Sequence, residues 1–500
     1  MELIANLALG FSAVATAEML AICFLGVLMG TFIGVLPGIG PLAAVAMLLP
    51  VSFHLPAAAA LVLLAGVYYG AEYGGSTAAI LLNIPGTPSS AVTCLDGYPM
   101  AQQGRAGVAL VLTAAASFAG GIFGVVVIAL LAPALAGFAL RFGPAEYFAV
   151  MVLGLVAATV VGGSGVVRGL MMVCLGLLLG TVGVDVSSGV TRFTAGIPEL
   201  RDGIGLVVVA MGLFGVAEVI ASARGGTRSH ATQALGWRRL LPGPGDWRRF
   251  PGPALRGAGV GAFFGTLPGT GQTVASFIGY ALEKRLSGRR ARFGEGAVEG
   301  VVVPEAANNA AAQTAFIPTL TLGIPGSTTM ALMLGALMIH GITPGPRLIA
   351  EHPALFWGLV VSFVFGNLFL LVLNIPLVGL WARLLRVPHG FLYPLVIVLI
   401  CVGVYSLRLS LFDVWLTLGF GVLGYAMRLW RFEPAPLLIG FVLGPMMEEY
   451  FRRAMLLSRG DPIVFLERPG SAVLLGLAAL LLVLAFGRVG RFLPFGRAGG

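Results

Sequence analysis

Two short motifs rich in glycine and proline, each present twice, are the parts of this chain best suited to binding chemistry. Gly30–Gly40 reads GTFIGVLPGIG and Gly261–Gly271 reads GAFFGTLPGTG, so the second copy follows the first by 231 positions. A second pair, NIPGTPSS at 83–90 and GIPGSTT at 323–329, is offset by 240 positions. Proline removes a backbone donor and glycine permits positive φ, so we expect a helix to break at each motif.

These four breaks can bind ions through backbone groups and hydroxyls. A helix N-terminus carries unpaired N–H groups and roughly half a positive charge, so it can hold an anion without a basic side chain. Unwound carbonyls at the same places suit Na⁺. With nearby amides, these groups predict sites for a small polar anion and an accompanying cation at Pro37, Gly38, Gly40, Asn83, Pro85, Gly86, Thr87, Ser89, Ser90, Pro268, Gly269, Thr270, Gly271, Gln272, Thr273, Asn308, Asn309, Pro325, Gly326, Ser327, Thr328 and Thr329.

A structural role for the breaks is the alternative. Gly/Pro breaks can be hinges or points of close packing, and hydroxyls in membrane helices often bond only their own backbone. Four breaks in two matched pairs favour the binding role. Glu72 and Glu305 stand in apolar runs, where an intramembrane carboxylate would be functional by default. Each could equally lie at an interface, so both interpretations of these two residues stay open.

The elements that carry the motifs must be membrane helices. Hydrophobic residues make up 58% of the chain and charged residues 10%, against about 25% charged in a soluble domain. Uncharged runs such as 106–140, 354–380 and 471–487 are long enough to span a bilayer. The net charge of +9 comes from arginines between such runs, which the positive-inside rule explains without nucleic acid. The four cysteines are isolated, so no metal site is predicted.

Matching breaks in two halves are typical of a transporter with internal repeats. We therefore predict an all-α polytopic membrane protein with two inverted repeats, about 11 spanning helices and two re-entrant hairpins broken at LPGxG. Residues 1–222 form the first repeat, 223–255 a basic cytoplasmic linker, and 256–500 the second repeat with an extra C-terminal helix.

The distribution of arginines sets the predicted orientation. Basic residues flank 256–282 on both sides, whereas 21–50 has none nearby, so the two hairpins are expected to enter from opposite sides. Residues 1–20 are predicted as an interfacial arm and 96–105 as a polar loop. Arginines of an outside loop at 451–470 are balanced by nearby acidic residues. The predicted spans are 57–80, 106–133, 145–161, 166–184, 204–222, 298–322, 354–376, 390–406, 412–427, 436–450 and 471–487.

One motif is compatible with catalysis. Gly162–Gly165 reads GGSG and fits the GxSG of a membrane serine protease. A serine nucleophile would need a histidine on a later membrane helix, and only His340 lies near one. A small-residue loop between spans is the favoured interpretation, so we predict no enzyme and no catalytic residue.

The longer blocks around the breaks resemble the large membrane subunit of the tripartite tricarboxylate transporters, the TctA family. The blocks are 30–50, 68–107, 265–285 and 304–346, and the similarity extends over nearly the whole chain. The resemblance implies a secondary active transporter for carboxylates, citrate-like in the named members, in the bacterial inner membrane. It also implies a small four-helix membrane subunit, a periplasmic substrate-binding protein and coupling to a Na⁺ or H⁺ gradient, with no cofactor.

Two other functions stay open from the sequence. A TRAP-type carboxylate carrier shares the tripartite organisation, although the blocks argue against it. A passive channel or a structural membrane scaffold would use the breaks to line a pore. Dependence of uptake on an ion gradient separates a carrier from a channel.

Overall fold

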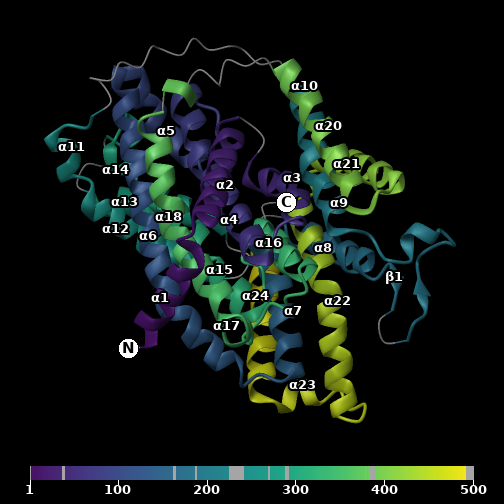
Figure 1. The fold of residues 1–500 in the computed structure, drawn as a ribbon. Coiled ribbons are helices and arrows are strands. Elements are labelled where there is room, and N and C mark those ends of the chain that lie inside the picture. The colour runs from purple at the N-terminus through teal and green to yellow at the C-terminus, as the bar shows by residue number, and fades with distance from the viewer. Residues whose placement is uncertain are drawn as a thin grey trace, which may run out of the picture. The chain divides into compact units, whose positions relative to one another are not determined.

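The structure is a computed structural model, and it describes residues 2–36, 40–161, 165–185, 188–224, 241–267, 271–287, 292–377, 379–381 and 389–490. Nearly all of this part of the chain is helical (Figure 1). The sheet within it is the antiparallel pair β1 (Gly183–Val184) and β2 (Thr191–Arg192), with Gly183 opposite Arg192. The predicted all-α fold class is confirmed.

Contacts between residues divide the chain into two compact units. Unit 1 comprises Met1–Gly137 and Val207–Tyr425, and unit 2 comprises Phe138–Leu206 and Ala426–Gly500. Each unit therefore takes segments from both halves of the sequence. The division into repeats at residues 222 and 256 stays a prediction.

Most helices belong to unit 1, and α6, α9 and α21 run across unit boundaries in the chain. Unit 1 holds α1 (Glu2–Val14), α2 (Ala17–Val35), α3 (Pro41–Ser52), α4 (Ala57–Leu82), α5 (Ala91–Met100), α6 (Ala106–Ala139), α9 (Leu206–Ala210), α10 (Ala217–Arg224), α11 (Pro244–Arg248), α12 (Pro251–Thr266), α13 (Gly271–Leu286), α14 (Val298–Thr314), α15 (Phe316–Leu322), α16 (Thr328–Ile339), α17 (Leu348–Glu351), α18 (Pro353–Asn374), α20 (His389–Arg408) and α21 (Leu411–Leu429). Unit 2 holds α7 (Pro144–Val161), α8 (Val166–Gly180), α22 (Pro434–Leu457), α23 (Val464–Glu467) and α24 (Pro469–Gly490). π-helical turns join α5 to α6 and α9 to α10.

Length and composition identify a polytopic membrane protein. The described helices that are long and apolar enough to cross a bilayer are Ala17–Val35, Ala57–Leu82, Ala91–Ala139, Pro353–Asn374 and Pro469–Phe486. Apolar side chains on outer faces, such as Leu130, Val402 and Val483, are more than half exposed, as expected where lipid covers them. Each predicted span coincides with a helix or with consecutive helices, except that 166–184 ends in β1 after α8. The number of crossings, their inversion and the re-entrant hairpins stay predictions.

In the first half, α2 packs against α4 through glycines spaced four residues apart. A Cβ built on any of these three glycines would lie 2.2 to 2.5 Å from a carbonyl oxygen of α4, so only glycine lets the backbones approach so closely. Small residues at this spacing are a common device for packing membrane helices. The pairs are Gly26 with Leu63, Gly30 with Val67, and Gly34 with Ala71.

In the second half, α12 packs against α14 in the same way. A Cβ on its three glycines would again lie 2.2 to 2.5 Å from carbonyl oxygens of the partner helix. The glycines follow those of α2 by 231 positions, and their partners follow those of α4 by 240. The motif offsets in the sequence therefore reappear as equivalent contacts. The pairs are Gly257 with Val303, Gly261 with Ala307, and Gly265 with Ala311.

The helices break where the sequence predicts. Both IPG motifs begin at a residue in the left-handed conformation, Asn83 with φ 56° after α4 and Gly323 with φ 71° after α15. At the LPGxG motifs, α3 begins after Gly40, with φ 31°, and α13 begins at Gly271, with φ 63°. Pro37, Gly38, Pro268, Gly269 and Thr270 lie outside the described residues.

One local prediction is wrong. The predicted polar loop 96–105 is the second half of α5 and a π-helical turn, because Asp96 is fully buried and accepts hydrogen bonds from distant backbone. The segment predicted as an interfacial arm forms α1 and the start of α2, and its place at a membrane interface stays a prediction. A Cβ on Gly10 of α1 would lie 2.3 Å from the carbonyl oxygen of Trp357 on α18, so α1 is packed against protein.

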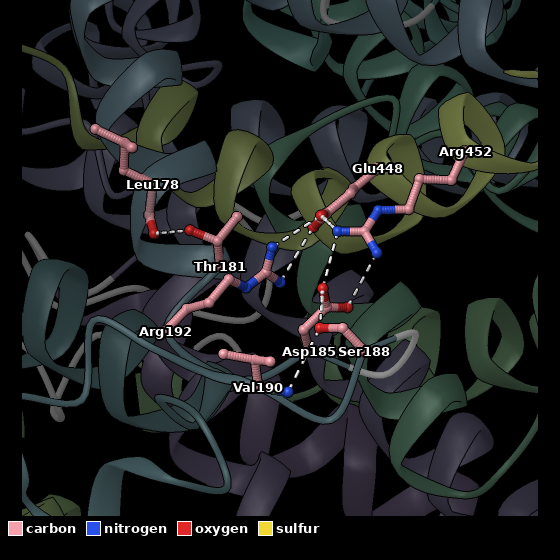
Figure 2. Close-up of polar contacts among 8 residues, drawn as sticks. All are labelled: Leu178, Thr181, Asp185, Ser188, Val190, Arg192, Glu448 and Arg452. Atoms are coloured by element: carbon pink, nitrogen blue, oxygen red, sulfur yellow. Dashed lines mark hydrogen bonds and ion pairs between the residues drawn. The ribbon is translucent and has the colours of Figure 1, made fainter. Parts of the chain in front are cut away.

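In unit 2, ion pairs link the segment after α8 to α22 (Figure 2). Arg192 donates from both terminal nitrogens to Glu448, at 2.8 and 3.2 Å. Arg452 bridges Glu448 at 2.6 Å and Asp185 at 2.9 Å. Figure 2 shows both guanidinium groups turned toward Glu448. Arg452, in the predicted outside loop at 451–470, is thus paired directly with nearby acidic residues.

Candidate functional site

Two buried carboxylates form the polar centre of unit 1. Glu72 on α4 is 2% exposed and Glu305 on α14 is 1% exposed, so both carboxylates lie inside the protein. Their depth in the membrane, which the sequence left open, stays a prediction. What surrounds each carboxylate decides what it can do.

Glu72 is bonded to groups from both halves of the chain. Its Oε2 accepts from Ser89 Oγ and from Asn308 Nδ2, each at 3.1 Å. The Ser89 hydroxyl lies 2.8 Å from Thr87 Oγ1 in the break after α4. Gln272, in the first turn of α13, also approaches Glu72, although its Nε2 makes no hydrogen bond of ordinary geometry. The first IPG break, the second LPGxG segment and α14 therefore meet at this carboxylate.

Glu305 is bonded by hydroxyls from three helices of the first half. Its Oε1 accepts from Ser76 of α4 at 2.7 Å and from Thr93 of α5. Its Oε2 accepts from Ser117 of α6 at 3.2 Å. These bonds use both oxygens and tie α14 to α4, α5 and α6.

Neither carboxylate pairs with a basic group. In the part of the chain that the structure describes, their hydrogen-bond donors are neutral hydroxyls and amides. An uncompensated buried charge costs several kcal/mol, which hydrogen bonds to neutral groups only partly offset. Each carboxylate must therefore be neutralised by a proton or by a bound cation.

Several buried polar atoms on α4 and α14 have no hydrogen-bond partner among the described residues. On α4 they include the hydroxyls of Tyr68 and Tyr69, one turn before Glu72. On α14 they include Asn308 Oδ1, beside Glu72, and Gln313 Oε1. Buried polar atoms in native proteins are nearly always satisfied, so Asn308 Oδ1 marks a place beside Glu72 for water, an ion or a substrate.

The two halves share this backbone arrangement but divide its chemistry. At the offset of 240, Tyr68, Tyr69 and Tyr73 correspond to Asn308, Asn309 and Gln313. Glu72 corresponds to Ala312 and Glu305 corresponds to Ala65, so each half supplies one acid, at positions that are not equivalent. The site is therefore asymmetric, although the helices that carry it pack alike.

Comparison with known proteins identifies the family. A family model described as "Tripartite tricarboxylate transporter TctA family" matches residues 20–439. The chain belongs to the TctA family. This confirms the resemblance seen in the sequence, and the family is one of transporters rather than enzymes.

Two relatives of this TctA protein come from Agrobacterium vitis. The chain is 49% identical over 488 residues to an uncharacterized 52.8 kDa protein in the TAR-I ttuC' 3'region, covering 97% of this chain and 96% of the relative. It is 52% identical over 225 residues to an uncharacterized protein in the TAR-II ttuC' 3'region, covering 45% of this chain and 93% of the relative. No solved structure matches the chain.

In this TctA protein, the first IPG break joins the polar cluster through its hydroxyls. Thr87, Ser89 and Ser90 are all buried, and Thr87 and Ser90 exchange backbone-to-hydroxyl bonds at 3.1 and 3.2 Å. Gly86 donates to the carbonyl of Gly75 at 3.3 Å, which folds the break back along α4. Asn83 and Pro85 are exposed, so they shape the break without entering the cluster.

The second IPG break lies beside the same cluster. Ser327 caps α16 by accepting from the backbone N–H of Met330 at 3.3 Å, and its side chain lies near the Tyr68 hydroxyl. Thr329 is buried, and Thr328 is half-buried. Pro325 and Gly326 are buried in the break itself.

The remaining predicted residues divide between the cluster and other places. Gln272 and Asn308 approach Glu72, as described above. Asn309 donates to the carbonyl of Glu305 on its own helix at 3.1 Å and does not join the cluster. Gly40 and Gly271 start helices, and Thr273 is half-buried on α13. The protease-like motif has its Gly162–Ser164 outside the described residues.

Sequence reasoning missed the residues that hold Glu305 and those that hold α5. Ser76, Thr93 and Ser117 are single hydroxyls in apolar helices and form no motif. Asp96 Oδ1 accepts from the backbone N–H groups of Gly294, Gly296 and Ala297 at 2.8 to 2.9 Å, and Oδ2 accepts from Tyr280. The available signal was a lone acid in a segment otherwise able to continue as a helix.

Proposed function

We propose that this chain is the large membrane subunit of a binding-protein-dependent secondary transporter that imports carboxylates. The substrates would be citrate-like tricarboxylates or related organic acids, and a Na⁺ or H⁺ gradient would drive uptake. The observation that carries this proposal is the buried polar cluster at Glu72. It joins breaks and helices from both halves inside a membrane protein of the TctA family.

The breaks suit a carboxylate without basic side chains. Two helices begin directly after the IPG breaks, α5 with 10 residues and α16 with 12. Their N-terminal N–H groups favour a negative charge, and neighbouring hydroxyls such as Thr87 and Ser327 can donate to carboxylate oxygens. Transporters of this kind place the substrate where broken helices meet.

Coupling to a cation follows from charge. Glu72 is buried among neutral partners, so its negative charge must be neutralised by a proton or a cation bound at the site. A carboxylate substrate brings further negative charge to the same region. Binding of a cation and of an anion would therefore stabilise one another, which is the physical requirement for symport.

The family name implies other subunits, and we propose a small four-helix membrane subunit and a periplasmic substrate-binding protein. The binding protein would deliver the carboxylate to the outer side of the bacterial inner membrane. The two halves would then rock about the buried cluster and expose it to each side in turn.

The family match favours this carrier over a TRAP-type subunit. A passive channel or scaffold would have no use for a carboxylate that must be neutralised. The test is uptake of labelled di- and tricarboxylates into vesicles that hold this chain and its small partner, with and without the binding protein, under imposed Na⁺ or proton gradients. We expect uptake to require the binding protein and one gradient. Uptake that is indifferent to both would refute the proposal and support a passive pore.

A further inference from the structure

The two buried carboxylates differ in how far their partners satisfy them. The three hydroxyls bonded to Glu305 occupy both of its oxygens. Both hydrogen bonds that end on Glu72 use Oε2, so these bonds leave Oε1 able to bind a further ligand. Glu72 therefore has one carboxylate oxygen, Oε1, that these hydrogen bonds do not use.

The groups around Glu72 are oxygen ligands. Ser89 Oγ bonds the carboxylate, and Thr87 Oγ1 lies 2.8 Å from that hydroxyl. Asn308 is 1% exposed and donates its Nδ2 to Glu72, whereas its Oδ1 has no partner among the residues that the structure describes. A buried acceptor beside a carboxylate gains a partner only from a donor or a cation. Carboxylate, hydroxyl and amide oxygens are the ligands that hard cations prefer.

The charge of the site selects a monovalent ion. One carboxylate balances one positive charge, and Glu305 bonds to a separate set of hydroxyls, those of Ser76, Thr93 and Ser117. In the described part of the chain, no third acidic residue bonds to this cluster. A divalent ion would therefore leave an uncompensated positive charge in the protein interior.

We propose that Glu72, Thr87, Ser89 and Asn308 form a binding site for one Na⁺ ion. Its role as the coupling ion rests on the proposed transport function, whereas the binding itself does not. Because Ser89 belongs to the first IPG break and Asn308 to α14, the ion would tie the break of one half to a helix of the other.

The test is thermal unfolding of the purified full-length chain in detergent, with NaCl replaced stepwise by choline chloride at constant ionic strength and pH. A ligand that binds the folded state raises its melting temperature in a saturable way. We expect this response to Na⁺ in the wild type and its loss in Glu72→Gln. Glu305→Gln is the matched control, because a glutamine there still accepts from hydroxyls, and it should keep the response.

Ser89→Ala provides a second test that does not remove the buried acid. Loss of one oxygen ligand should raise the Na⁺ concentration needed for half of the melting-temperature shift by about tenfold. Ser89→Ala also keeps the proposal testable if Glu72→Gln does not fold. A folded Glu72→Gln or Ser89→Ala with the wild-type Na⁺ response would overturn the site.

Uptake separates this proposal from the proposed function. A wild type with no Na⁺ response that still imports carboxylate under a proton gradient would overturn Na⁺ as the occupant and leave the transport function standing. A saturable Na⁺ response that depends on Glu72, in a chain without carboxylate uptake, would support the site and contradict the transport function.

Discussion

Substitution of Gly261 by alanine tests the packing that the two halves share. A Cβ on Gly261 would lie 2.2 Å from the carbonyl oxygen of Ala307 and 2.8 Å from its carbonyl carbon. Both atoms are backbone, so no side chain can turn away to make room. Gly259, on the same helix, has nothing within 4 Å of its Cβ position and serves as the control.

The expected cost follows from these distances. Ordinary contact for a Cβ begins near 3.4 Å, so α12 and α14 would have to separate by roughly 1 Å along a packed interface. Overpacking of this kind costs about 3 kcal/mol, and the better helix propensity of alanine returns about 1 kcal/mol. Gly259→Ala has no steric cost and keeps only the gain of about 1 kcal/mol in helix propensity. The two variants should therefore differ by about 3 kcal/mol in the free energy of unfolding.

The assay is equilibrium unfolding of both purified variants in detergent, followed by tryptophan fluorescence. Gly30→Ala should behave like Gly261→Ala, because its Cβ would lie 2.2 Å from the carbonyl oxygen of Val67. If Gly261→Ala is as stable as Gly259→Ala, close backbone contact between these helices is not what holds the halves together.

Three further substitutions test long-range contacts by thermal unfolding. Asp96→Ala leaves three backbone N–H groups without an acceptor and should cost about 4 kcal/mol or more, whereas Asp96→Asn keeps an acceptor and should cost about 1–2 kcal/mol; equal losses would contradict this. Arg256→Ala leaves the buried Glu283 without its ion-pair partner and should lower the free energy of unfolding by about 2 kcal/mol. The loss is no larger because Arg256 is itself 44% exposed. Adding Glu283→Gln should restore most of that loss, and a double variant as unstable as the single one would refute the reasoning. Arg192→Ala should cost about 1 kcal/mol at low salt and almost nothing in roughly 1 M NaCl, and a loss that salt does not change would argue against an ion pair.

The helices and their breaks could be predicted because their signals are local. Long uncharged runs and Pro/Gly pairs act on the residues around them, so α4 and the break at Asn83 follow from the sequence. The repeat offsets in the sequence reappear as equivalent contacts, since glycines at the same spacing occur in both copies.

The partners of the buried acids could not be predicted, because they are distant in the sequence. Ser76 lies 229 positions from Glu305, and Asp96 bonds to backbone about 200 positions away. A polar residue in an apolar run has the same local pattern whether it faces solvent, an interface or a buried acid. For this reason the sequence predicts a loop at Asp96 and leaves both the membrane interior and an interface open for Glu72 and Glu305.

The measurement that tests the central claim most directly compares uptake by Asn308→Ala and Asn374→Ala in reconstituted vesicles. Both asparagines are buried, but Asn308 donates to Glu72 whereas Asn374 donates to the carbonyl of Leu370 on its own helix. If the cluster at Glu72 is the transport site, Asn308→Ala should lose gradient-driven carboxylate uptake at normal membrane abundance, and Asn374→Ala should retain it. Equal uptake by the two variants would place the transport site elsewhere.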